Sequence, residues 1–224
     1  MKTNYRNVFL LVVLMTFSNF EMQTNKIVKY LPLGDSYTIC TGANEDESWP
    51  KILTEHLNKA NFKTTLLANP ARNGYTTGQL IDRELPIFKT LKPDFVTLLI
   101  GVNDWVQEVP IQKFEANLKY ILNEIEKVIT NKKIILITIP DFGVTPTGKM
   151  YGGGRNIEKG ISEFNDLIKK EAKQRGLPLV DLFELSQKMG QDATLVAKDG
   201  LHPSAKEYAI WETLILPKAI KALE

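Results

Sequence analysis

Four short clusters of polar residues and glycines carry the side-chain types that acyl-transfer chemistry needs. A serine hydroxyl, an imidazole, a carboxylate and amide donors are all among them, which suggests nucleophilic attack by a serine. Long apolar stretches separate the clusters along the chain. They are Gly34-Asp35-Ser36, Asn73-Gly74, Gly101-Val102-Asn103-Asp104 and Asp199-Gly200-Leu201-His202.

Ser36 is the candidate nucleophile, and His202 is its candidate base. A serine hydroxyl attacks poorly until a neighbouring base takes its proton. The chain has only two histidines, His56 and His202, and His202 lies three residues after Asp199. A carboxylate at that spacing can accept a hydrogen bond from Nδ1–H and leave Nε2 facing the serine. We therefore predict Ser36, His202 and Asp199 as the catalytic residues.

The same clusters supply donors for a developing oxyanion. Acyl transfer needs hydrogen-bond donors at the place where negative charge forms in the transition state. The candidates are the backbone N–H groups of Ser36 and Gly74 and the side-chain amide of Asn103. Gly74 has no Cβ, so its backbone can approach a ligand closely.

Strands that alternate with helices must position these clusters. Continuous apolar runs predict five buried strands, and helical spacing predicts five longer helices between and after them. The strands are expected at Ile27–Leu33, Phe62–Leu67, Phe95–Ile100, Ile134–Ile139 and Leu179–Leu182. The helices are expected at about Ser48–Ala60, from Thr76 or Thr77 to about Leu85, and at Ile111–Ile129, Ile157–Arg175 and Pro203–Leu223.

This alternation predicts a parallel sheet covered by helices on both faces. Ligands bind beyond the carboxyl ends of the strands in such sheets, which is where the polar clusters follow their strands. A strand order of 2-1-3-4-5 would place the first three clusters on neighbouring strands.

Together the clusters resemble the sequence blocks of the SGNH hydrolase (GDSL esterase/lipase) superfamily, over about Ile27 to Pro217. Gly34–Tyr37 is similar to the nucleophile block, with Tyr37 where many members have Leu. Gly101–Asp104 and Asp199–Pro203 match the G-x-N-D and D-x-x-H blocks in full, whereas Asn73-Gly74 is the least specific match. The resemblance implies a flavodoxin-like three-layer α/β/α sandwich and an acyl-ester hydrolase without cofactor or metal. It gives Ser36, His202, Asp199, Gly74 and Asn103 the roles above.

Composition excludes several other classes of protein. The 28 Lys and Arg residues nearly balance the 26 Asp and Glu residues, for a formal net charge of +2. A nucleic-acid-binding domain carries a clear basic excess, so no nucleic-acid partner is expected. Two histidines and the single Cys40 are too few for a typical zinc site and allow no internal disulfide.

The N-terminus has the pattern of an export signal. Lys2 and Arg6 precede the apolar run Val8–Phe17, which is shorter than the roughly 20 residues that span a membrane. We expect a signal peptide over residues 1–22, one catalytic domain over 23–224, and a secreted or periplasmic location. No A-x-A-like cleavage site follows the run, so an uncleaved membrane anchor stays open.

Several alternatives remain at this stage. The α/β-hydrolase motif G-x-S-x-G fails because residue 38 is Thr, and no complete nucleotide-binding glycine motif is present. A glycan-binding module without catalysis is a remote alternative.

The substrate is expected to be a small-molecule, glycan or lipid ester, including thioesters and lysophospholipids, with carbohydrate O-deacetylation as the second choice. The glycine-rich loop Val144–Gly160 is either a mobile lid or an ordinary surface loop.

Overall fold

A single parallel sheet organises the chain in the computed structural model, which describes residues 26–224. The predicted signal peptide, residues 1–22, lies outside the described residues. The five strands lie side by side in the order β2-β1-β3-β4-β5, as predicted. They are β1 (Val28–Gly34), β2 (Thr64–Leu66), β3 (Phe95–Leu99), β4 (Ile134–Ile137) and β5 (Leu179–Val180).

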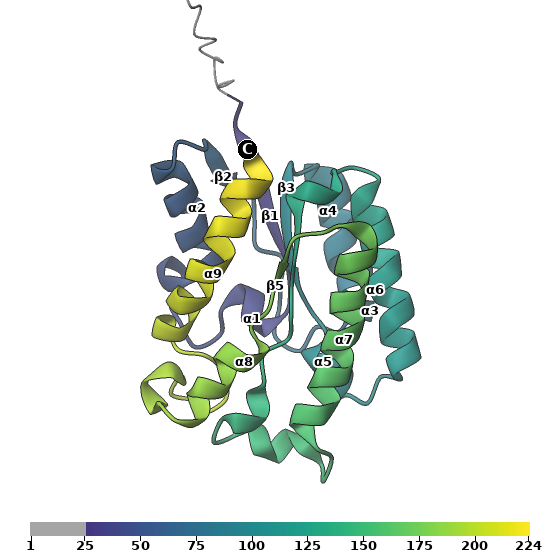
Figure 1. Cartoon of the computed structure of the whole chain (residues 1–224), viewed down its shortest axis with the longest axis vertical. Helices are drawn as coiled ribbons and strands as arrows, with labels where there is room; N and C mark the ends of the chain where they lie inside the picture. Colours follow the sequence, from purple (N-terminus) through teal and green to yellow (C-terminus); the bar gives the residue numbers. More distant parts are fainter. Residues whose placement is uncertain (1–25) are drawn as a thin grey trace, which may run out of the picture.

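Helices cover both faces of this sheet, so the predicted three-layer α/β/α class is confirmed (Figure 1). Helices α2 (Trp49–Lys59) and α9 (Ala205–Leu223) pack together on one face. Helices α4 (Leu85–Leu91), α6 (Ile111–Glu126) and α7 (Ile157–Arg175) cover the other. The short helices α1 (Ser36–Ile39), α3 (Thr77–Gln79), α5 (Val102–Val106) and α8 (Phe183–Ser186) follow or precede the longer elements. The two ends of the described chain lie together at the amino ends of the strands.

The apolar runs of the sequence form strands that are buried in the core. Strands β3 and β4 are buried along their whole length, as expected for parallel strands covered on both faces. The register pairs Gly34 at the end of β1 with Leu99 at the end of β3. The polar clusters that follow these two strands therefore begin beside each other.

The predicted elements exist, but some of their bounds were wrong. The helix predicted to end near Leu85 continues through a π-helical turn, Leu80–Glu84, into α4. The last helix begins at Ala205 rather than Pro203, because Ser204 caps it and Pro203 pairs with Val196 in an isolated bridge. Helices α1 and α5 were not predicted, since four or five residues are too few to show a helical period.

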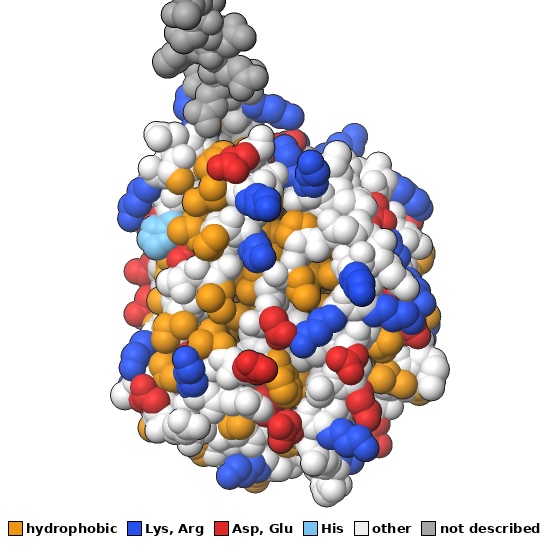
Figure 2. Space-filling model, in the orientation of Figure 1, with side chains coloured by type: hydrophobic (Ala, Val, Ile, Leu, Met, Phe, Trp, Pro, Cys, Tyr) orange, Lys and Arg blue, Asp and Glu red, His pale blue; other side chains and the backbone are white. Residues whose placement is uncertain are grey.

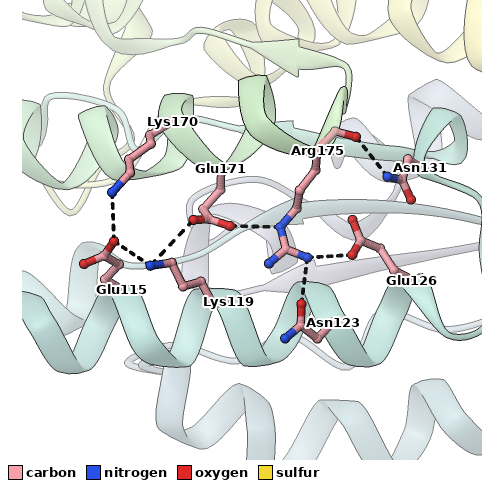
Figure 3. A network of polar contacts seen from close by, with 8 residues as sticks. All are labelled: Glu115, Lys119, Asn123, Glu126, Asn131, Lys170, Glu171 and Arg175. Carbon is pink, nitrogen blue, oxygen red and sulfur yellow. Dashed lines mark hydrogen bonds and ion pairs between the residues drawn. The ribbon is translucent and has the colours of Figure 1, made fainter.

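A polar network joins α6 to α7 on the side of the sheet away from α9 (Figure 3). Glu171 is buried and accepts a hydrogen bond from Arg175 at 2.8 Å. Arg175 also reaches Glu126 at 2.5 Å and Asn123 at 2.8 Å on α6. Because Arg175 bridges carboxylates from both helices, the network fixes how α7 lies on α6.

Positive and negative side chains are interspersed over the face that α7 and α9 present (Figure 2). Hydrophobic atoms lie between them, so this face carries no field of a single sign. Among residues 26–224, no helix combines the length and hydrophobicity needed to cross a membrane.

Candidate active site

Ser36 is the first residue of α1 and is separated from the end of β1 by a single residue, Asp35. Asp35 caps this helix, and its carboxylate accepts a hydrogen bond from the Tyr37 N–H at 3.0 Å. Asp35 therefore holds the turn through its side chain, as aspartate commonly does. The Ser36 residue is 6% exposed. The turn thus presents a hydroxyl that is shielded from bulk water and still reachable from one side.

Two buried carboxyl groups lie directly behind this turn. Glu84 Oε2 accepts a hydrogen bond from the Gly34 N–H at 3.0 Å. Burial raises the pKa of both Asp35 and Glu84 to about 8. The second oxygen of each, Asp35 Oδ2 and Glu84 Oε1, has no hydrogen-bond partner among the described residues. Both groups therefore hold a proton at neutral pH for part of the time, and a carboxylic acid is the form that burial favours.

His202 and Asp199 form a hydrogen-bonded pair. His202 Nδ1 lies 2.7 Å from Asp199 Oδ2. Asp199 Oδ1 accepts from the backbone N–H groups of Leu201 and His202, each at 2.9 Å. Partial burial raises the pKa of Asp199, but these hydrogen bonds outweigh burial, and the net pKa is lowered. The carboxylate therefore stays ionised and orients the imidazole so that Nε2 is free.

Tyr37, which replaces the more usual Leu of the nucleophile block, packs against this imidazole. The two rings meet edge to face, with their centroids 6.0 Å apart. The Tyr37 ring is buried and also contacts Trp211 of α9. The substitution therefore adds an aromatic support for His202.

The loop that carries Gly74 is tied to α5 by two side-chain amides. Asn103 donates to the Tyr75 carbonyl at 3.0 Å, and Gln107 donates to the Gly74 carbonyl at 3.0 Å. Gly74 itself has a φ of +80°, a conformation that glycine adopts without strain. The Asn103 amide has a second proton, which this contact leaves available for a ligand.

Asp104 of the same cluster has a structural role. Both of its carboxylate oxygens accept hydrogen bonds from Thr77, at 2.8 Å from the backbone and 2.5 Å from the hydroxyl. The residue is fully buried. It therefore anchors the start of α3, which follows the Gly74 loop.

A small cavity of about 60 Å³ brings most of the predicted residues together. Ser36, Asn103 and His202 line it. Asp199 lies behind His202, and Gly74 is not among the lining residues. Between Ser36 and His202, both within the described chain, the structure has no direct hydrogen bond. The remaining walls are mostly apolar and come from Tyr37, Val102, Val106, Phe142, Tyr151 and Leu201.

Other residues singled out in the sequence lie elsewhere. His56 pairs with Glu212 at 3.1 Å between α2 and α9, and Cys40 is buried, so both have structural roles. Asp141 and Asp181, which follow strands β4 and β5, accept hydrogen bonds from Gln187 and Thr138 and do not line the cavity. No group of three or more His, Cys, Asp or Glu side chains within residues 26–224 could hold a metal ion.

A larger cavity of about 520 Å³ lies at the opposite end of the sheet. Its walls include Val28 at the start of β1, Asp94 before β3 and Lys133 before β4. None of the candidate catalytic residues lines it. The chemistry suggested by the sequence therefore belongs to the smaller cavity at the carboxyl ends of the strands.

Sequence reasoning did not find Glu84, Gln107 or Phe142. Each contributes through a contact between segments far apart in the sequence. Glu84 contacts Gly34, Gln107 contacts Gly74, and Phe142 lines the cavity. From the sequence, the Gly148–Gly154 loop with Met150 and Tyr151 could shape an acyl pocket or a sugar platform, and of these two side chains only Tyr151 lines the cavity. The π-helical turn that ends at Glu84 is a local irregularity, but the sequence around it shows only an amphipathic helix.

Comparisons with known proteins identify the family of the chain. The sequence model of the GDSL-like Lipase/Acylhydrolase family matches residues 33–210. The chain is 26% identical to Thioesterase 1/protease 1/lysophospholipase L1 of Escherichia coli strain K12, over 90% of this chain and 88% of that protein. It is 27% identical to a Multidomain esterase of Ruminococcus flavefaciens over 81% of this chain, but spans only 27% of that longer protein.

Solved structures show the same fold. The psychrotrophic esterase EstA of Pseudoalteromonas sp. superposes with a TM-score of 0.68 at 21% identity, over 88% of this chain and 98% of that one. The family match covers most of the chain and all four clusters. The chain therefore belongs to the GDSL-like lipase/acylhydrolase family, and its enzyme class, that of a carboxylic ester hydrolase, follows from that membership.

Proposed function

We propose that the chain hydrolyses carboxylic acyl esters through a covalent intermediate on Ser36. The observation that carries the proposal is the His202–Asp199 pair, joined at 2.7 Å, with His202 lining the same cavity as Ser36 and Asn103. A base oriented by a carboxylate and placed in one cavity with a serine is the arrangement that activates a hydroxyl.

The first half of the reaction forms the acyl-enzyme. His202 Nε2 takes the proton from Ser36 Oγ, which attacks the carbonyl carbon of the ester. The resulting oxyanion accepts hydrogen bonds from Asn103 and from the Ser36 and Gly74 N–H groups. The tetrahedral intermediate collapses as the carbon–oxygen bond to the alcohol breaks, and the alcohol leaves with the proton from His202.

The second half returns the free enzyme. His202 takes a proton from a water molecule, whose oxygen attacks the acyl carbon. Collapse of the second tetrahedral intermediate breaks the bond to Ser36 Oγ, which recovers its proton from His202. Asp199 stays ionised throughout and stabilises the imidazolium.

Hydrolysis of p-nitrophenyl esters, from acetyl to long-chain acyl groups, by wild type and Ser36→Ala tests this proposal. We expect a loss of roughly 10³-fold or more in kcat for Ser36→Ala. Equal hydrolysis by both proteins would show that Ser36 is not the nucleophile. If wild type cleaves only acetylated sugars, carbohydrate O-deacetylation, our second candidate, replaces general esterase activity.

Export of the enzyme is a separate proposal that rests on the N-terminal sequence. The charged and apolar pattern of residues 2–17 is that of a secretory signal. Edman sequencing of the protein expressed with its full N-terminus should give a mature chain that starts near residue 23. A chain that keeps Met1 and sediments with membranes would support the uncleaved anchor instead.

A further inference from the structure

Part of the segment between β4 and α7 lies against the catalytic cavity and forms a strap that hydrogen bonds hold on two sides. We define the strap as residues 144–156, and it contains a 3₁₀ helix, Gly148–Gly152. On one side, Thr147 donates from its backbone to Gly200 at 2.8 Å and from its hydroxyl to the Asp199 carbonyl at 3.0 Å. The strap is therefore bonded to the loop that carries the acid and the base.

On its other side the strap is bonded to α5. Arg155 donates to the Trp105 carbonyl at 2.8 Å and to the Gly152 carbonyl at 3.1 Å. Its guanidinium lies 4.0 Å from the centre of the Trp105 ring, a cation–π contact. Because both ends of the strap are held, the side chains between Thr147 and Arg155 have defined places relative to Ser36.

Tyr151 is the strap residue that reaches the catalytic cavity. It lines the cavity together with Ser36 and His202, and the residue is 44% exposed. The neighbouring Met150 is 80% exposed and does not line the cavity. Tyr151 thus forms an outer wall, and Val106 of α5 and Phe142 of the 3₁₀ helix Phe142–Val144 form apolar walls.

The size of the cavity limits what it holds. Its volume of about 60 Å³ is well below the roughly 300–1,000 Å³ of pockets that bury drug-sized ligands. A short acyl group such as acetyl or propionyl suits a space of this size, whereas the tail of an octanoyl chain would reach the Tyr151 ring at its outer wall.

We propose that Tyr151 closes the acyl pocket and makes the enzyme selective for esters of short acids, acetyl and propionyl above all. The inference rests on the proposed serine-esterase function and names the substrate class of that site. The apolar walls suit the methyl end of the acyl group.

The test is a ratio of kcat/KM for octanoyl and acetyl p-nitrophenyl esters, which does not depend on how much of a variant is folded. In wild type we expect the acetyl ester to be favoured by about tenfold or more. Tyr151→Ala should raise the octanoyl-to-acetyl ratio by about tenfold. Met150→Ala is the matched control on the same strap and should keep the wild-type ratio, as should Tyr151→Phe, which keeps the ring.

A second variant is needed because truncation of Tyr151 could let the strap fill the space that the ring leaves. Val106→Ala enlarges the same cavity from α5 and should shift the ratio in the same direction. A wild type that prefers octanoyl esters, or a ratio that neither Tyr151→Ala nor Val106→Ala moves, would overturn the inference and leave the esterase proposal intact. A wild type that cleaves no ester at any chain length would overturn both the esterase proposal and this inference.

Discussion

Glu84 accepts a hydrogen bond from the Gly34 N–H at 3.0 Å, so a buried carboxyl group fifty residues downstream holds the end of β1 from which Ser36 projects. Glu84 is fully buried, and its other oxygen has no hydrogen-bond partner among the described residues. Burial raises its pKa from an ordinary 4.5 to about 8. The backbone that leads into the nucleophile turn is therefore hydrogen-bonded to a carboxyl group, that of Glu84, whose protonation changes close to neutral pH.

Glu84→Gln should weaken the dependence of folding stability on pH. Between pH 4.5 and about 8 the folded state holds a proton on Glu84 that the unfolded state has released. The unfolded state then binds fewer protons, so the free energy of unfolding falls as pH rises through this window. One such group contributes a slope of up to about 1.4 kcal/mol per pH unit. Gln keeps an acceptor for Gly34 and cannot titrate.

Urea unfolding of wild type and Glu84→Gln at intervals from pH 5 to 8 measures this slope. Asp46→Asn, at an exposed position, is the control and should follow wild type. Parallel curves for Glu84→Gln and wild type would mean that Glu84 is ionised throughout this window in the folded protein.

Asn103→Ala should reduce kcat by roughly 10²–10³, because the variant removes a donor to the oxyanion. The same change also removes the bond to Tyr75 that helps to hold the Gly74 loop. Gln107→Ala separates the two effects, since Gln107 holds this loop through the Gly74 carbonyl only. We expect Gln107→Ala to lose less than about tenfold in kcat. Equal losses in both variants would make Asn103 a positioning residue.

Asp199→Asn and Asp199→Ala should differ in stability but share a large loss of activity. The Asn side chain keeps an oxygen for the Leu201 and His202 N–H groups, so the loop should persist. It loses the carboxylate that accepts from His202 Nδ1, and kcat should fall by about 10⁴. Asp199→Ala also leaves the two N–H groups without their acceptor and should unfold at lower denaturant concentration. An active Asp199→Asn enzyme would argue that the pair is structural.

The catalytic clusters could be predicted from sequence because each is local and follows an apolar strand. The strand order and the pairing of His202 with Asp199 both agree with that reasoning. Glu84 could not be predicted, because its role depends on a contact that only the folded chain creates. The sequence offered Tyr151 and Met150 together as residues that could shape an acyl pocket, and only the folded chain separates them. Nothing in the sequence places the carboxyl group of residue 84 beside the backbone of residue 34.

The contacts of the strap, residues 144–156, could not be predicted from the sequence either. Its glycines suggested a mobile lid or an ordinary loop, but they do not reveal what the segment contacts. Arg155 and Thr147 tie it to α5 and to the Asp199 loop. A cation–π contact and two bonds to backbone carbonyls leave no periodic signal in a sequence.

The close approach of Thr147 to Gly200 leads to the last prediction. Gly200 has a φ of +70°, and a Cβ there would lie 2.6 Å from Thr147 Oγ1. Gly200→Ala should therefore lower the free energy of unfolding by more than about 1 kcal/mol, from backbone strain and from this clash. It should also lower kcat, because it displaces the loop between Asp199 and His202.

A double-mutant cycle with Thr147→Ala separates strain from clash. Thr147→Ala removes the hydroxyl that the new Cβ would meet, so the second substitution should cost less in that background by about 0.5 kcal/mol or more. The part of the cost that remains measures the backbone strain at residue 200. Additive effects of the two substitutions on stability would show that a Cβ at residue 200 does not meet the Thr147 hydroxyl, and the clash would then play no part in the loss.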